Sequence, residues 1–136
     1  MMSAERKIIR VRDVMKHDFD MVDGRITVMD ALRTMKHVET KTLLVNKRND
    51  DDEYGIVMLS DIAKHVLATD RAPERVNVYE VMSKPVICID PDMDIRYCAR
   101  LFDKFGLSRA PVVENRKVVG IVSFTDMVLN GMIQNG

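Results

Sequence analysis

The stretch Gly120-Ile121-Val122-Ser123-Phe124-Thr125-Asp126 has a near copy elsewhere in this chain of 136 residues. The copy, Gly55-Ile56-Val57-Met58-Leu59-Ser60-Asp61, lies 65 residues earlier and keeps the glycine, both apolar residues and the aspartate. A second motif precedes each of these stretches. It is Val11-Arg12-Asp13-Val14-Met15 before the stretch at Gly55 and, 67 residues later, Val78-Tyr79-Glu80-Val81-Met82 before the stretch at Gly120. Self-similarity at a nearly fixed spacing indicates a duplicated structural unit. The chain is therefore predicted to contain two copies of one fold.

The repeats predict the boundaries of the two copies, at residues 8–67 and 76–132, with short tails at 1–7 and 133–136. Residues 68–75 are polar and include a proline, which is typical of a linker. The spacing changes from 67 to 65 within Asn46 to Glu53, so this polar stretch is expected to be a surface turn that tolerates insertion.

Both copies show the same order of predicted elements, β-α-β-β-α, after a helical turn at the VxxVM segment. Apolar residues recur at helical spacing after Thr27 and after Asp94, and both are preferred N-cap residues. The last helix of each copy begins near Ser60 or Thr125, which places Asp61 and Asp126 in its first turn. The strands are predicted at 42–46, 54–59, 86–89, 110–114 and 117–124, with Asn115-Arg116 as a hairpin turn. The predicted fold class is α/β of the α+β type.

Composition excludes several classes of protein. Hydrophobic residues make up 46% and charged residues 31%, a balance typical of a globular domain. The 21 basic and 21 acidic residues cancel, so a nucleic-acid partner that needs a large basic surface is not expected. No apolar run approaches the ~20 residues that span a bilayer, so no membrane partner is expected. The two cysteines show no disulfide framework, and the expected location is the cytoplasm.

The sequence shows no catalytic or metal-binding pattern. It contains no GxSxG, HExxH, GxGxxG or phosphate-binding loop. Its three histidines, His17, His37 and His65, are scattered without metal-ligand spacing. Both Cys88 and Cys98 fall in apolar stretches and are expected to be buried thiols. No catalytic residue, no metal site and no enzymatic activity are predicted.

The chain resembles the cystathionine-β-synthase (CBS) domain in three motifs that occur in the same order. These are the VxxVM segment and the GIVxxxD pattern, both present in each copy, and the Pro-Val-Val strand of the second copy. The whole chain, from about Ile8 to Met132, resembles a tandem CBS pair. The resemblance implies a pseudo-two-fold module with ligand clefts for an adenosyl compound: AMP, ADP, ATP or S-adenosylmethionine. It also implies a stand-alone regulatory module that needs no cofactor and acts on an unidentified partner protein when its ligand shifts the arrangement of the repeats.

The second copy matches the family's ligand pattern of Gly, two apolar residues, Ser or Thr, any two residues and Asp. An ionised Asp126 offers two acceptor oxygens for the hydroxyls of a ribose. Ser123 and the free N–H groups near Thr125 suit a phosphate. The alternative is that Ser123, Thr125 and Asp126 only cap a helix. The resemblance adds a phosphate contact from Arg109 and an adenine pocket at residues 85–87, and the alternative for Arg109 is an ordinary exposed surface side chain. The predicted ligand-binding residues are Pro85, Val86, Ile87, Arg109, Ala110, Pro111, Gly120, Ile121, Val122, Ser123, Thr125 and Asp126.

The first copy departs from this pattern. A weaker second site is predicted from Gly55, Ile56, Val57 and Asp61. Met58 stands where the family has Ser or Thr and cannot donate a hydrogen bond to a phosphate, so this site is expected to be weak or empty. The function predicted from the sequence is an adenine-nucleotide sensor. The alternative is a ligand-free dimerisation module. In both cases the module is expected to be a homodimer, paired through apolar positions of its last helices.

Overall fold

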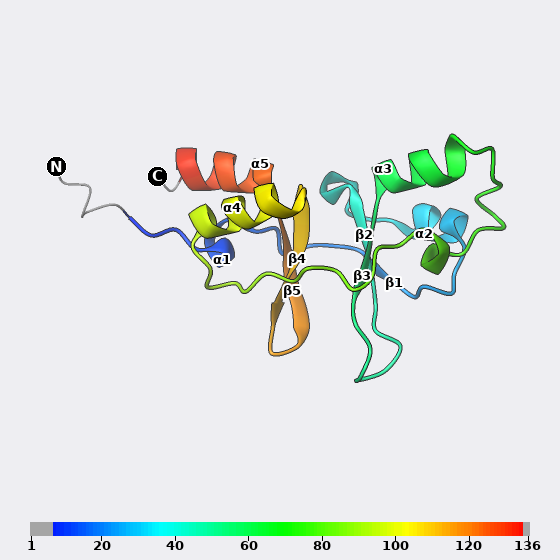
Figure 1. Ribbon diagram of the computed structural model, residues 1–136, viewed down its shortest axis with the longest axis horizontal. Helices are drawn as coiled ribbons and strands as arrows, with labels where there is room; N and C mark the ends of the chain where they lie inside the picture. Colours follow the sequence, from blue (N-terminus) through cyan, green and yellow to red (C-terminus); the bar gives the residue numbers. More distant parts are fainter. Residues whose placement is uncertain (1–6, 135–136) are drawn as a thin grey trace. The chain divides into compact units, whose positions relative to one another are not determined.

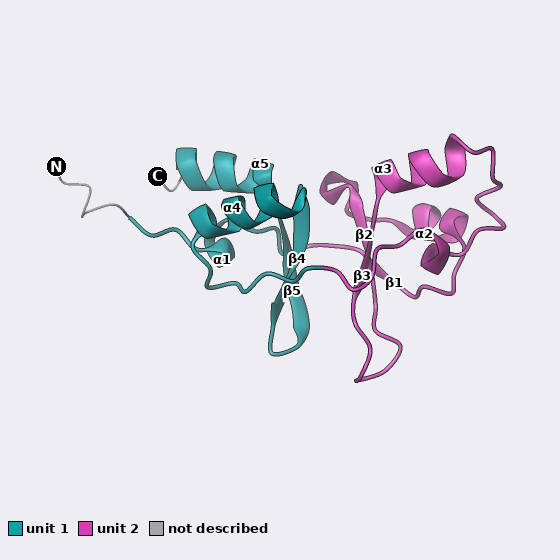
Figure 2. Cartoon of the chain, in the orientation of Figure 1, with its two compact units in different colours: residues 1–17, 87–136 teal, residues 18–86 magenta. Residues whose placement is uncertain are grey.

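The computed structural model describes residues 7–134 (Figure 1), so the tails expected at 1–7 and 133–136 lie mostly outside the described residues. The chain divides into two compact units (Figure 2). Unit 1 comprises Met1–His17 and Ile87–Gly136, and unit 2 comprises Asp18–Val86. Both units combine short helices with a small sheet, which confirms the predicted mixed α and β fold.

Unit 2 is built on a three-stranded sheet in the order β1-β2-β3. Its strands are β1 (Met21–Val22), β2 (Thr42–Val45) and β3 (Gly55–Met58), and its helices are α2 (Val28–Thr34), η2 (Val38–Thr40), α3 (Leu59–Ile62), η3 (Ala63–Leu67) and η4 (Val78–Glu80). Strands β1 and β2 are parallel, and α2 lies in the crossover between them, as parallel neighbours require. Strands β2 and β3 are antiparallel. The buried core includes Val28, Ala31, Leu43, Val57, Val66 and Val78.

Unit 1 is built on a two-stranded hairpin, with α4 and α5 beside it in Figure 1. Its elements are α1 (Val11–Val14), α4 (Ile95–Phe105), β4 (Arg109–Glu114), β5 (Lys117–Ser123), α5 (Phe124–Asp126) and η5 (Met127–Gln134). The turn residues Asn115 and Arg116 have φ angles of 53° and 67°, the left-handed geometry of a two-residue hairpin, as predicted. The buried core includes Val11, Val14, Ile95, Phe102, Val112 and Val122.

The N-caps predicted from the sequence are confirmed. The side chain of Thr27 accepts a hydrogen bond from the N–H of Asp30, and that of Asp94 accepts one from the N–H of Arg96. Helix α2 ends at Thr34, and Val38, the last apolar position of the predicted helix, is exposed.

The two VxxVM segments each fold with the strands of the other copy. Val11 and Val14 belong to the core of unit 1, whereas Val78 and Val81 belong to the core of unit 2. The residue after each segment continues the exchange: Lys16 pairs its backbone with Ile121, and Ser83 pairs with Ile56. The compact units and the sequence repeats therefore divide the chain at different places.

The strand predicted at residues 86–89 is wrong. Only Ile89 forms a bridge, to Val112 of unit 1, while the N–H of Val86 donates to the carbonyl of Tyr54 in unit 2. The segment passes from one unit to the other, so no continuous partner strand runs along it. Cys88 is accordingly exposed, in contrast to the expected burial, whereas Cys98 is buried on α4.

None of the helices within residues 7–134 is long and apolar enough to cross a membrane.

Candidate functional site

The junction of β5 and α5 holds the side chains of Ser123 and Asp126 in a reciprocal cap. The N–H of Asp126 donates to Oγ of Ser123 at 3.1 Å, and Oδ2 of Asp126 accepts from the N–H and Oγ of Ser123 at 3.0 and 2.9 Å. Asp126 is buried, with 3% of its surface exposed. The capping role that the sequence offered as an alternative is therefore present.

The remaining oxygen of Asp126 is held by a cation that the sequence reasoning missed. Nζ of Lys16 forms an ion pair with Oδ1 of Asp126, and about a third of the lysine side chain is exposed. Lys16 reaches this position because its backbone N–H and C=O both bond to Ile121, at 2.9 Å each. The signal was present in the sequence: Lys16 follows the VxxVM segment directly, and the second copy has Ser83 at that place.

Gly120 permits this close approach. A Cβ atom on Gly120 would lie 2.6 Å from the backbone oxygen of Lys16 and 2.8 Å from Sδ of Met15. Side-chain atoms are not tolerated at such distances from a backbone oxygen. The glycine of the GIV pattern therefore admits the neighbouring segment of chain in unit 1.

The hairpin of unit 1 brings most of the predicted residues to one end. Arg109 pairs across the hairpin with Ser123, and Ala110 pairs with Val122. Ala110, Pro111, Gly120, Ile121 and Val122 are buried, whereas Thr125 is exposed. Ile87 packs on the core of unit 1. The cationic Lys16 and Arg109 thus belong to the same unit as Asp126.

Pro85 and Val86 do not join this group. They lie in unit 2, where Ser83 exchanges two backbone hydrogen bonds with Ile56 of β3. Val86 bonds to Tyr54, the residue before β3. The structure therefore groups Pro85 and Val86 with Gly55–Asp61, whereas the sequence reasoning placed them with Asp126.

The junction of β3 and α3 in unit 2 repeats only part of this arrangement. Oδ2 of Asp61 accepts a hydrogen bond from the N–H of Met58 at 2.9 Å, and no hydrogen bond or ion pair engages Oδ1 among the described residues. Asp61 is half-buried and lines a cavity of about 450 Å³ together with Ser83, Arg71 and His65. Within this cavity Arg71 is paired with Glu80 at 2.9 Å. The N–H of Asn77, and then Arg71, hold the pKa of Glu80 below its usual value.

The two thiols of the described residues differ in exposure, since Cys88 is exposed and Cys98 is buried. Burial raises the pKa of the Cys98 thiol to about 11, so it stays protonated near neutral pH. No group of three or more His, Cys, Asp or Glu side chains suited to a metal ion occurs within residues 7–134.

Solved structures share this fold. The chain superposes on the hexameric CBS-CP12 protein from bloom-forming cyanobacteria with a TM-score of 0.86 and 32% identity, covering 93% of this chain and 74% of that one. For the CBS domain pair of protein MJ0100, solved in complex with 5-methylthioadenosine and S-adenosyl-L-methionine, the TM-score is 0.73 and the identity 26%, over 90% of this chain and 94% of that one.

Curated relatives carry the same region within longer chains. A homoserine O-acetyltransferase of Methanosalsum zhilinae is 34% identical over 128 residues, which are 93% of this chain and 24% of that protein. The chain spans 57%, 24% and 59% of the lengths of three such relatives. The sequence profile of the CBS domain matches residues 11–68 and again residues 78–130, so the chain belongs to the CBS domain family and carries two copies of that domain.

Proposed function

We propose that this CBS pair is a regulatory module that binds an adenosyl compound. Ligand binding changes the conformation that a regulated protein recognises, and the module itself catalyses no reaction. The observation that carries the proposal is a carboxylate, Asp126 or Asp61, in the first turn of the helix after the last strand of each unit. A carboxylate there can accept both hydroxyls of a ribose. The MJ0100 complex, with its two adenosyl ligands on the same fold, supports this ligand class.

Unit 1 is proposed to take the phosphorylated members of the class: AMP, ADP or ATP. Ribose hydroxyls would replace the ammonium of Lys16 at Oδ1 of Asp126. Because its side chain is about a third exposed, Lys16 can turn away and pair with the phosphate instead. Arg109 lies at the same end of the hairpin and adds a second cation. The remaining residues predicted for this site, Ile87, Ala110, Pro111, Gly120, Ile121, Val122, Ser123 and Thr125, form its walls in this proposal.

Unit 2 is proposed to take the members without a phosphate, such as 5-methylthioadenosine or S-adenosylmethionine. Unit 2 has Ser83 at the position of Lys16 and Met58 at the position of Ser123. Its nearby cation, Arg71, is already paired with Glu80. Asp61 keeps one carboxylate oxygen for a ribose beside a cavity of about 450 Å³. Such a volume is within the range of small-molecule pockets. Gly55, Ile56, Val57, Pro85 and Val86 complete the proposed site.

Calorimetric titration with AMP, ATP, 5-methylthioadenosine and S-adenosylmethionine tests both assignments. We expect Asp126→Asn to weaken AMP binding by about tenfold or more, because charge-assisted hydrogen bonds contribute about 1.5–3 kcal/mol each. We expect Asp61→Asn to weaken 5-methylthioadenosine binding to a similar degree. Asp103→Asn, at an exposed position of α4, is the matched control and should change neither. If no adenosyl compound binds at millimolar concentration, the proposal fails.

A second candidate function is a dimerisation module, favoured by exposed apolar side chains on η5. Val128, Leu129, Met132 and Ile133 are 45%, 49%, 69% and 70% exposed. Large exposed apolar patches commonly mark protein interfaces, and two-fold dimers are the commonest oligomers. Light scattering should return the mass of a homodimer, and Leu129→Glu should shift it toward 15.6 kDa. A monomer in the unmodified protein would remove this candidate.

A further inference from the structure

Unit 2 contains a cavity of about 430 Å³ at the ends of β1 and β2, away from the β3–α3 junction. We call it the Tyr79 pocket. Its apolar lining comes from Val45, Tyr79 and Met82, and its cationic lining from Arg25, Arg48 and Lys84. A smaller cavity of about 280 Å³ shares Arg25 and Arg48 with it. The pocket has the usual size and composition of a small-molecule site, an apolar surface with a few charged groups.

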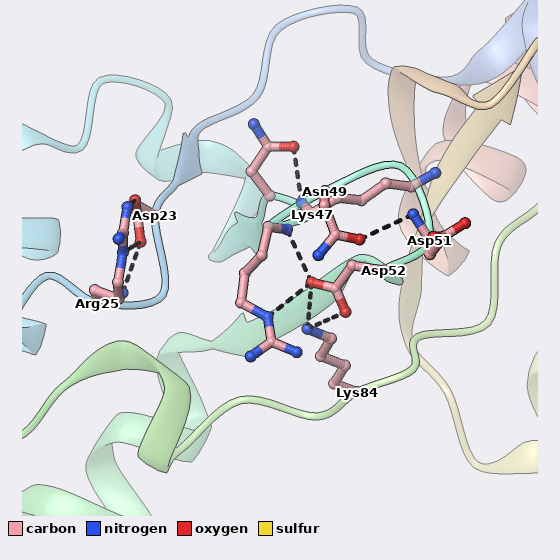
Figure 3. Close-up of polar contacts among 9 residues, drawn as sticks. Asp23, Arg25, Lys47, Asn49, Asp51, Asp52 and Lys84 are labelled. Carbon is pink, nitrogen blue, oxygen red and sulfur yellow. Dashed lines mark hydrogen bonds and ion pairs between the residues drawn. The ribbon is translucent and has the colours of Figure 1, made fainter.

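The charged groups leave a cationic excess at the pocket. Arg25 is paired with Asp23 at 2.7 Å, and this pairing lowers the pKa of Asp23 to about 2. Asp52 is paired with both Arg48 and Lys84, at 3.2 and 2.7 Å, so one carboxylate serves two cations. Figure 3 shows Arg25 against Asp23 and Lys84 reaching Asp52.

Arg48 retains donors for a further anion. Only Nε of its guanidinium is engaged by Asp52, and no hydrogen bond or ion pair engages its two terminal nitrogens among the described residues. Its side chain is 74% exposed and therefore accessible to a ligand. The other acidic residues of the β2–β3 loop, Asp50, Asp51 and Glu53, do not line either cavity. A guanidinium with two free terminal nitrogens is suited to a phosphate group.

Tyr79 presents an aromatic ring beside these cations. It is 52% exposed although it lines the cavity, so one part of the ring is open to a ligand. Its backbone is fixed by a hydrogen bond from its N–H to the carbonyl of Gly24 at 2.9 Å. An offset-stacked or edge-on ring contact stabilises a bound aromatic ring beyond the effect of the area that it buries.

Unit 1 has side chains of different charge at the equivalent positions. Arg12 stands where unit 2 has Tyr79, Asp92 where it has Arg25, and Glu114 where it has Lys47. Arg12 pairs with Asp92 and with Glu114, at 2.8 Å each, and these side chains satisfy one another. In unit 2 the central cation has become an aromatic ring and both surrounding carboxylates have become cations. The three-residue ion-pair network of unit 1 therefore has no counterpart at these positions of unit 2, where Arg25 pairs with Asp23 and Lys47 lies over the ring of Tyr54.

We propose that the Tyr79 pocket binds a small aromatic phosphate monoester, with its ring against Tyr79 and its phosphate on Arg48 and Lys84. This site is separate from the proposed adenosyl sites, although Met82 lines both this pocket and the cavity beside Asp61. In the free protein Asp52 forms ion pairs with both Arg48 and Lys84. The phosphate therefore competes with Asp52 for Lys84.

Amide chemical shifts measured by NMR during titration with phenyl phosphate locate the binding site. We expect concentration-dependent shifts at Gly24, Asn46, Arg48 and Tyr79, with much smaller shifts from inorganic phosphate or from phenol alone. The same shifts should persist in Asp61→Asn and Asp126→Asn, which separates this site from the adenosyl sites. Shifts confined to Ser60–Asp61 or Thr125–Asp126 would overturn the proposal. The absence of binding at millimolar phenyl phosphate, in tenfold excess over the protein, would also overturn it.

Two substitutions should act in opposite directions on the dissociation constant. Arg48→Ala should weaken phenyl phosphate binding by about tenfold, since one charge-assisted contact is lost. Asp52→Asn should strengthen it by roughly threefold to tenfold, because the competing carboxylate charge is removed. Arg33→Ala, an exposed arginine on α2 of the same unit, is the matched control and should leave the constant unchanged. Equal weakening by Arg48→Ala and Arg33→Ala would show non-specific attraction and overturn the assignment.

Discussion

The turn at Asp126 in unit 1 and the turn at Asp61 in unit 2 begin from the same sequence pattern and reach different electrostatic states. Each aspartate sits at the third position of a helix and accepts a hydrogen bond from the backbone three residues before it. Asp126 is also held by the side chains of Ser123 and Lys16, whereas no side chain within residues 7–134 bonds to the carboxylate of Asp61. The pattern thus determines the helix start, while residues outside the pattern determine what the carboxylate can bind.

The largest expected difference between the two turns concerns their glycines. Gly120→Ala would place a methyl group 2.6 Å from a backbone oxygen, whereas in Gly55→Ala the nearest atom, at 3.0 Å, is the flexible Sδ of Met82. We expect Gly120→Ala to lower the free energy of unfolding by about 3 kcal/mol and Gly55→Ala by about 1 kcal/mol. Urea denaturation of both variants measures this, and equal losses would contradict the role given to Gly120.

The aspartates should differ by a smaller amount. Asp126→Ala removes the two hydrogen bonds that the carboxylate accepts from Ser123 and a partly exposed ion pair with Lys16, and we expect a loss of about 2 kcal/mol in the free energy of unfolding. Asp61→Ala removes one backbone hydrogen bond from a half-buried carboxylate, and a loss of about 1 kcal/mol is expected. The same denaturation experiment compares them. A larger loss for Asp61→Ala would reverse the comparison.

Exchanging Lys16 and Ser83 tests whether these two residues determine the difference in AMP affinity between the two units. Lys16→Ser gives unit 1 the residue of unit 2, and we expect AMP affinity to fall by about tenfold because a phosphate contact is lost. Ser83→Lys adds a cation near Asp61 and should give unit 2 measurable affinity for AMP. Calorimetry on each variant and on the double exchange tests this. Unchanged AMP binding in Lys16→Ser would show that Lys16 serves Asp126 alone.

The smallest expected effect is on the pH dependence of stability. Lys84 and the N–H of Arg48 hold the pKa of Asp52 well below its usual value near 3.8, and Arg12 lowers that of Asp92. A lowered carboxyl pKa contributes stability that is present above the usual value and lost as pH falls through the folded-state value. The free energy of unfolding should therefore decline as pH falls from about 4 toward 2. Asp52→Asn should make this decline shallower, and an unchanged slope would contradict it.

Local features of the fold were predictable because their causes lie within a few residues. The caps at Thr27 and Asp94 and the turn at Asn115-Arg116 follow from side chains that bond to, or permit, the adjacent backbone. The placement of Lys16 depends on pairing with Ile121, more than 100 residues away, and a repeat pattern contains no information about which copy a segment will join. The strand predicted at 86–89 failed for the same reason.

The exchange of the VxxVM segments has a consequence for the order of folding during synthesis. Unit 2 is one continuous stretch, Asp18–Val86, and can complete its core as soon as Val86 is free of the ribosome. Unit 1 needs both ends of the chain, so Val11 and Val14 must wait for Val122, which follows roughly 5–20 s later at ordinary rates of translation. During that interval the waiting segment of one chain can enter unit 1 of a neighbouring chain on the same messenger RNA. Segment-swapped dimers are the product expected from such crowding.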